Sequence, residues 1–125
     1  MTKQVNSEES KKLIDAIIEG IQRKKGLDII IADLTKVENT ECDYFIICHG
    51  TSNTQVGALA SSVEETVKEL LNEQAWQTDG YRNAQWILLD YANIMVHVFQ
   101  KEYRDFYDIE GLWADAQFTN IETEN

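Results

Sequence analysis

Residues 85–100 read Gln-Trp-Ile-Leu-Leu-Asp-Tyr-Ala-Asn-Ile-Met-Val-His-Val-Phe-Gln, and they predict a β-hairpin. Its two arms, Gln85–Tyr91 and Ile94–Gln100, are rich in aromatic, β-branched and aliphatic residues, which suit a pleated, half-buried surface. Ala92-Asn93 joins the arms as a two-residue connection. Such a turn requires positive φ, which Asn tolerates and Ala tolerates poorly. We therefore expect the rest of the fold to be built around this hairpin.

Alternation along the two arms separates an aliphatic face from a mixed face. The aliphatic face, interpreted as the core face, carries Ile87, Leu89, Ile94, Val96 and Val98. The mixed face carries Trp86, Leu88, Asp90, Met95, His97 and Phe99. A face turned only to water would be more polar, and one turned only to the core would lack the acid and the imidazole. The mixed face is therefore the candidate for function, with Asp90 expected to pair with His97 across the hairpin.

Aromatic residues on and near this face have two readings. Taken singly, Trp86, Phe99, Tyr107 and Trp113 are each more often core residues than binding residues. Taken together, beside an acid and a histidine, they have the composition of a protein interface with an aromatic centre.

The remaining elements follow from periodicity and turn signals. Apolar residues at helical spacing predict helices over about 7–25 and 53–73, capped by Asn6 and Ser52 respectively. Apolar runs predict buried strands at 27–34 and 43–49, and 75–77 predicts a short edge strand before a turn at 79–80. Toward the C-terminus we expect a helical turn at 102–106, packing of Leu112 and Trp113 on the body, and an acidic tail that frays over about 117–125.

This order of elements predicts an α/β fold (α+β-like) in a single domain over 1–125. Two long amphipathic helices and four or five strands favour a two-layer arrangement, with a mixed sheet and helices mainly on one face. The other face of the sheet would then meet solvent or a partner.

Charge and hydropathy narrow the class of protein. The net charge of −11 argues against phosphate-driven binding of nucleic acid, which needs clustered Lys and Arg. An acidic surface attracts a basic protein partner, although it also serves solubility alone, and the two readings are about equally favoured. Apolar runs stay shorter than the roughly 18 residues of a membrane span, and the N-terminus lacks the apolar core of a signal peptide. We therefore expect a cytoplasmic protein without membrane contact.

Candidate chemistry is sparse. The turn Gly50-Thr51-Ser52 lies between a predicted strand and a predicted helix, where a phosphate could bind, as in nucleotidyltransferases. The metal-binding Asp-x-Asp pair of such enzymes does not occur in the sequence, and Ser52 as a helix cap is the favoured reading. Cys42 and Cys48 match no common zinc spacing, and Cys48 lies in an apolar run typical of a buried strand. We expect no catalytic residue, metal or cofactor; a nucleotide-binding enzyme using the Gly50-Thr51-Ser52 turn is the alternative.

Several motifs resemble the ribosomal silencing factor family, also called Iojap-like proteins. The resemblance runs from about Leu13 to Ala116. It rests on Trp86-Ile-Leu-Leu-Asp90-Tyr, Val96-His97-Val98-Phe99, Arg104-x-Phe106-Tyr107-Asp108-x-Glu110-x-Leu112-Trp113-x-Asp115-Ala116, Asp43-Tyr44-Phe45-Ile46-Ile47 and Gly50-Thr51-Ser52-Asn53-x-Gln55-Val56. Three positions depart from the family pattern: Ala92 stands where the family has the hairpin glycine, Thr54 where it has a basic residue, and Asp79 where it has Glu before Gly80.

The resemblance implies a non-enzymatic binding protein. Such proteins bind the large ribosomal subunit through large-subunit ribosomal protein fourteen, block joining of the small subunit, and lower translation when nutrients are scarce. Their fold resembles the nucleotidyltransferase sheet without its catalytic pair. The resemblance assigns partner binding to Trp86, Asp90, His97, Phe99 and Tyr107, and Leu88 and Met95 share their face. A homodimer stays open as a further partner.

Overall fold

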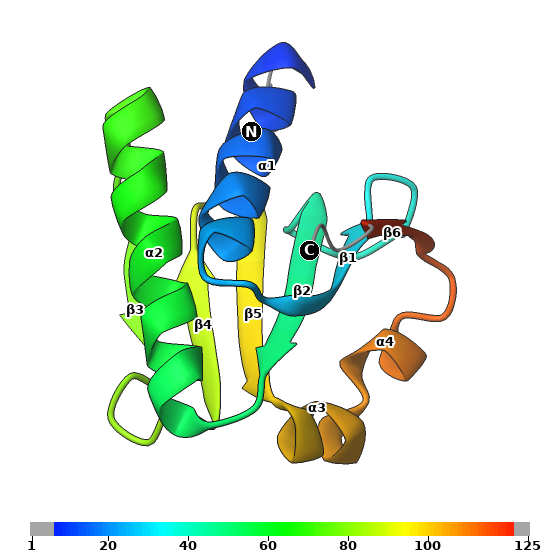
Figure 1. The fold of residues 1–125 in the computed structure, drawn as a ribbon. Helices are drawn as coiled ribbons and strands as arrows, with labels where there is room; N and C mark the ends of the chain where they lie inside the picture. The colour runs from blue at the N-terminus through cyan, green and yellow to red at the C-terminus, as the bar shows by residue number, and fades with distance from the viewer. Residues whose placement is uncertain (1–6, 122–125) are drawn as a thin grey trace.

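The predicted hairpin is present and lies inside a six-stranded mixed sheet in the computed structural model, which describes residues 7–121 (Figure 1). The elements in chain order are α1 (Ser7–Arg23), β1 (Leu27–Asp33), β2 (Tyr44–Gly50), α2 (Asn53–Leu71), β3 (Gln77–Asp79), β4 (Trp86–Asp90), β5 (Ile94–Gln100), α3 (Lys101–Tyr107), α4 (Ile109–Leu112) and β6 (Gln117–Ile121). Asn6, the predicted cap of the first helix, lies outside the described residues. The predicted cap of α2 is confirmed, because Ser52 Oγ accepts a hydrogen bond from the Gln55 backbone at 3.1 Å.

The strands lie in the order β3-β4-β5-β2-β1-β6. β2 and β5 are parallel, and all other neighbouring pairs are antiparallel. The prediction of a mixed sheet is thus confirmed, but the count of four or five strands was too low. The sixth strand, β6, covers residues that we expected to fray. It pairs with β1 in continuous register, with Thr119 opposite Ile31, and so covers the outer edge of β1. The polar sequence of this segment does not by itself indicate a strand.

Helices α1 and α2 pack together over the face of the sheet predicted to be the core (Figure 1). The five aliphatic side chains of the hairpin on this face are fully buried, in one core with residues of both helices. Gly20 brings the helices into close contact: a Cβ at this position would lie 2.7 Å from Val63 Cα. Ser62 Oγ, on α2, also donates a 2.7 Å hydrogen bond to the Gly20 carbonyl.

The opposite face, which we expected to meet solvent or a partner, is partly covered as well. Phe45, Ile47 and Phe99 of the sheet form a second core with Ile109 of α4, and Trp113 packs against it. Trp113 therefore docks as predicted, with its ring edge-on to Phe45 at a centroid distance of 5.6 Å. Leu112 does not dock, because 75% of its surface is exposed.

The hairpin turn places Ala92, and not Asn93, at positive φ (75°). The Asn93 N–H bonds back to the Tyr91 carbonyl, and the Ala92 N–H bonds to Asp90 Oδ1 at 2.8 Å. Asn93 is occupied elsewhere: its carbonyl accepts from the backbone of 43–44, and its side chain bonds to Ser10 Oγ at 3.2 Å. Asn93, which tolerates positive φ better than Ala92 does, is thus used to join the turn to α1 and β2.

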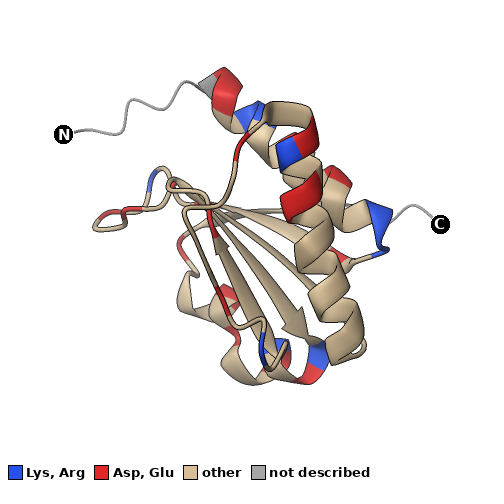
Figure 2. Ribbon diagram, turned by 90° about the vertical axis from the view of Figure 1, so that its left-hand side faces the viewer, with Lys and Arg blue, Asp and Glu red and all other residues tan. Residues whose placement is uncertain are grey.

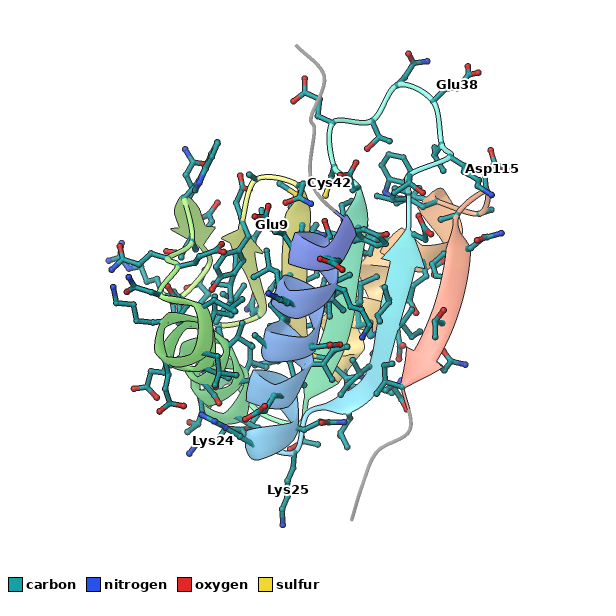
Figure 3. The ribbon with its side chains drawn as sticks, turned by 90° about the horizontal axis from the view of Figure 1, so that it is seen from above. Glu9, Lys24, Lys25, Glu38, Cys42 and Asp115 are labelled. Atoms are coloured by element: carbon teal, nitrogen blue, oxygen red, sulfur yellow. The ribbon has the colours of Figure 1, made fainter. Side chains whose placement is uncertain are left out.

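Charged residues are concentrated on the helices, loops and strand ends, while the middle of the sheet is free of them (Figure 2). Along α1, Glu9 lies near one end, and Lys24 and Lys25 follow the other end, as the helix dipole favours (Figure 3). Among residues 7–121, no helix combines the length and hydropathy that crossing a membrane requires.

Candidate functional site

An aromatic stack occupies the mixed face of the hairpin. Trp86 lies between Phe99, opposite it in the strand register, and Tyr107 of α3, with ring centroids 4.9 Å away in each case. Phe106 contacts Tyr107 edge-on at 5.1 Å. We call Trp86, Leu88, Asp90, Met95, His97, Phe99 and Tyr107 the aromatic face.

His97 fixes the orientation of Trp86. The indole Nε1 of Trp86 donates a 3.1 Å hydrogen bond to His97 Nδ1. Because indole can only donate, Nδ1 is unprotonated and the neutral ring carries its proton on Nε2. Burial lowers the pKa of His97 to about 4, so the ring is neutral at pH 7. Nε2 is buried without a hydrogen-bond partner in the described part of the chain. The Phe45 ring lies edge-on to the imidazole at 4.6 Å.

Residues of the aromatic face differ in accessibility. Tyr107 is 44% exposed, and Trp86, Leu88, Asp90 and Met95 are partly exposed. Phe99 is fully buried and His97 is 6% exposed, so both lie behind the accessible surface.

The expected pairing of Asp90 with His97 is wrong. The strand register sets Asp90 opposite Met95 and His97 opposite Leu88. The Asp90 carboxylate instead accepts from the Ala92 N–H and so belongs to the turn.

The rim of this face offers further apolar surface. Phe106 on α3 is 78% exposed, which is unusual for a large aromatic side chain. A hollow of about 220 Å³, lined by Asp79, Gly80, Trp86 and Leu88, adjoins the indole. A partner side chain could therefore sit against Trp86.

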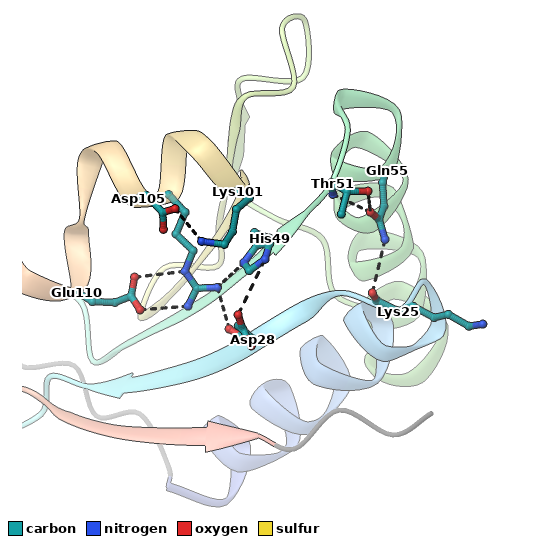
Figure 4. A network of polar contacts seen from close by, with 9 residues as sticks. Lys25, Asp28, His49, Thr51, Gln55, Lys101, Asp105 and Glu110 are labelled. Carbon is teal, nitrogen blue, oxygen red and sulfur yellow. Dashed lines mark hydrogen bonds and ion pairs between the residues drawn. The ribbon is translucent and has the colours of Figure 1, made fainter.

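The Gly50-Thr51-Ser52 turn is filled by the chain itself. Gln55 Oε1 accepts from the Thr51 backbone N–H at 2.8 Å and from the Thr51 hydroxyl at 3.0 Å. Gln55 Nε2 reaches back to the carbonyl of Lys25 at 3.5 Å (Figure 4). Ser52 Oγ is likewise occupied, because it accepts from the Gln55 N–H. A phosphate at this turn would have to displace the Gln55 side chain.

The cysteines are structural. Cys42 and Cys48 are both buried. Burial raises the pKa of Cys48 to about 12, so its thiol is inert at neutral pH. Within residues 7–121, His, Cys, Asp and Glu side chains form no cluster able to hold a metal ion.

Sequence reasoning missed a buried ionic network centred on Arg104, which is only 6% exposed (Figure 4). Its guanidinium bonds to the Glu110 carboxylate at 3.1 and 3.3 Å, to the Asp28 carbonyl at 2.9 Å and to His49 Nδ1 at 2.8 Å. Arg104 thereby ties α3 to β1, β2 and α4. The signal was present in the tail motif, where Arg104 and Glu110 stand six residues apart.

Comparison with solved structures supports the fold. A crystal structure of a protein from Chromobacterium violaceum superposes with a TM-score of 0.78 at 32% identity, covering 92% of this chain and 95% of that one. The ribosomal silencing factor RsfS of Bacillus subtilis is 35% identical over 99 residues, covering 79% of this chain and 82% of its own length. The RsfS of C. violaceum is 38% identical over 97 residues, covering 78% of each.

A family described as "Ribosomal silencing factor during starvation" matches residues 7–125. Fold and comparisons thus define a class: regulators of translation that bind the large ribosomal subunit and are not enzymes. The chain belongs to the ribosomal silencing factor family, as its sequence motifs indicated.

Proposed function

We propose that the chain docks on large-subunit ribosomal protein fourteen through the aromatic face and thereby prevents the small subunit from joining. The observation that carries this proposal is the stack of Tyr107 on Trp86, partly exposed on a rigid sheet beside the exposed Phe106. Aromatic anchors of this kind dominate the binding energy of protein interfaces.

The seven residues of the aromatic face divide into two roles in this proposal. Trp86, Leu88, Asp90, Met95 and Tyr107 have accessible surface and would contact the partner. His97 and Phe99 are buried and would act by holding Trp86 in one orientation, through the hydrogen bond to its indole and the ring stack beneath it. A pre-oriented indole loses less conformational freedom on binding.

Charge supports a protein partner over naked RNA. At −11, the chain repels phosphates, whereas a basic ribosomal protein is attracted to it and associates faster. We therefore expect the chain to bind the large subunit without sequence-specific contact to rRNA. Raising the salt concentration is then expected to slow association more than it speeds dissociation.

Steric blocking requires no turnover. Inhibition of subunit joining is therefore expected to be stoichiometric with large subunits and independent of added nucleotide. The proposal places this action in the cytoplasm, where free subunits meet, and under nutrient limitation.

Co-sedimentation with separated ribosomal subunits tests the proposal. We expect binding to large subunits and to the isolated ribosomal protein fourteen, and none to protein-free rRNA at physiological salt. Strong rRNA binding with a steep salt dependence would contradict the proposal, as would silencing by sub-stoichiometric protein. Sedimentation equilibrium of the free protein tests whether a homodimer competes for the same face.

We also propose that the sheet is related to the nucleotidyltransferase sheet and lacks its acidic pair. The parallel strands β2 and β5 and the strand–Gly50-Thr51-Ser52–helix turn support this relation. Superposition on solved nucleotidyltransferases would test it, and a different strand order would contradict it.

A further inference from the structure

A polar pocket of about 560 Å³ lies outside the aromatic face, near the carboxyl ends of the parallel strands β2 and β5. Its charged and polar lining consists of Asp28, His49, Lys101, Arg104, Asp105, Asp108, Glu110 and Asn120. Figure 4 labels Asp28, His49, Lys101, Asp105 and Glu110 of this set. Pockets of about 300–1,000 Å³ hold small molecules, and the carboxyl ends of parallel strands are where α/β sheets bind them. The pocket is thus suited in size and place to a small ligand.

Two buried side chains build the floor of this pocket. Arg104 is 6% and His49 is 3% exposed, and Arg104 Nη1 lies 2.8 Å from His49 Nδ1. Because a guanidinium can only donate, Nδ1 is the acceptor and the neutral imidazole carries its proton on Nε2. Burial, followed by the charge of Arg104, lowers the pKa of His49 and keeps the ring neutral. The network therefore fixes one hydrogen-bond donor, His49 Nε2–H.

That donor lacks a hydrogen-bond partner among the described residues. Asp28 Oδ2 lies 4.0 Å from His49 Nε2, which is beyond hydrogen-bond distance. Asp28 itself stands at φ 48°, beside the register shift of β1 between Leu27 and Ile30. A gap of this size between a donor and a carboxylate admits a bridging group.

The pocket offers both signs of charge at close quarters. Lys101 Nζ bonds to Asp105 at 2.7 Å and keeps further N–H groups for a ligand. The Asp28 side chain is 74% exposed, and its carboxylate lies no closer than 4.0 Å to His49 Nε2. A simple cation would leave His49 without an acceptor, and a simple anion would face the Asp28 carboxylate. A ligand with adjacent positive and negative groups satisfies both.

We propose that the polar pocket binds a free α-amino acid as its zwitterion. Its carboxylate accepts from His49 Nε2–H and Lys101 Nζ, and its ammonium group donates to Asp28. This inference goes beyond the docking function and does not depend on which ribosomal protein the aromatic face contacts.

An NMR titration of the full ¹⁵N-labelled chain tests the proposal, using each common free amino acid as the probe at constant pH and salt. We expect at least one of them to give saturable shifts at the amides of Lys101, Asn120 and Ile121. The amide and N-acetyl derivatives of that amino acid each lack one charge, and each should bind about tenfold more weakly or worse, a loss of about 1.4 kcal/mol. Absence of saturable shifts up to the solubility limit would overturn the proposal, and so would equal binding of either derivative.

Matched variants locate the site. Asp28→Asn removes the carboxylate and retains a residue type that tolerates positive φ, so the fold is expected to persist. It should weaken amino-acid binding at least tenfold. Asp115→Asn, on an exposed residue beyond the other end of β6, should leave binding unchanged. Equal affinity of wild type and Asp28→Asn would overturn the assignment. Both variants should still co-sediment with large subunits, so failure here is distinct from failure of the docking proposal.

Discussion

Replacing two adjacent residues of β4 separates binding from folding, because Trp86 and Ile87 point to opposite faces of the sheet. Trp86→Ala removes the ring contacts with Phe99 and Tyr107, each worth about 0.5–1.5 kcal/mol, and the hydrogen bond to His97, worth about 1 kcal/mol. Since the indole is partly exposed, we expect a stability loss of about 2 kcal/mol. Ile87 is fully buried, and Ile87→Ala should cost about 3 kcal/mol through the cavity it leaves. Thermal melts followed by circular dichroism should show Tm falling by about 4 °C per kcal/mol.

Affinity for the large subunit should rank the two variants in the opposite order. Truncating an aromatic anchor costs about 2 kcal/mol or more of binding, roughly thirtyfold in Kd. Ile87→Ala lies on the face covered by α1 and α2, so its folded fraction should bind as wild type does. Both affinities are measured well below the lower Tm, by co-sedimentation over a range of protein concentrations. If folded Trp86→Ala binds within threefold of wild type, the aromatic face is not the interface.

Three further predictions concern stability. Ala92→Gly should raise the free energy of unfolding by about 1 kcal/mol, since glycine relieves the positive φ; no gain in urea denaturation would contradict the strain. Gly20→Ala should lower it by about 2 kcal/mol despite better helix propensity, because the new Cβ meets the Val63 backbone; a gain would disprove the close helix contact. The pKa of His97 is depressed in the fold, so its contribution to stability is complete above about pH 6.5 and is lost as the pH falls toward about 4. The urea concentration at the denaturation midpoint should therefore decrease as the pH is lowered through that interval, and it should decrease less steeply in His97→Gln.

The hairpin and the long helices could be predicted because periodicity and local chemistry agree there. The alternation over 85–100 gave the correct core face, and the helical spacing gave α1 and α2 to within two residues at each end. β6 could not be found this way. The segment 117–121 is mostly exposed, and only its pairing with β1, about ninety residues earlier in the chain, makes it a strand.

The sequence predicted which residues make up the candidate site, but not which of them are buried. Alternation identified the side of the sheet on which Trp86 and Phe99 lie, but it could not tell that α3 and α4 cover part of that side. Phe99 is consequently buried while Tyr107 remains accessible. The Arg104–His49 contact joins residues 55 positions apart, so periodicity carried no trace of it.

Strand β6 also has a consequence for aggregation. β1 contains the apolar run Ile29-Ile30-Ile31, uncharged and without proline, which is the kind of segment that stacks into intermolecular sheets when its backbone is free. In the folded chain its hydrogen bonds are satisfied by β2 on one side and β6 on the other. Because β6 is translated last of the described elements, β1 stays an open edge until residues 117–121 have been made. A chain cut before Gln117 would keep that edge permanently and self-associate.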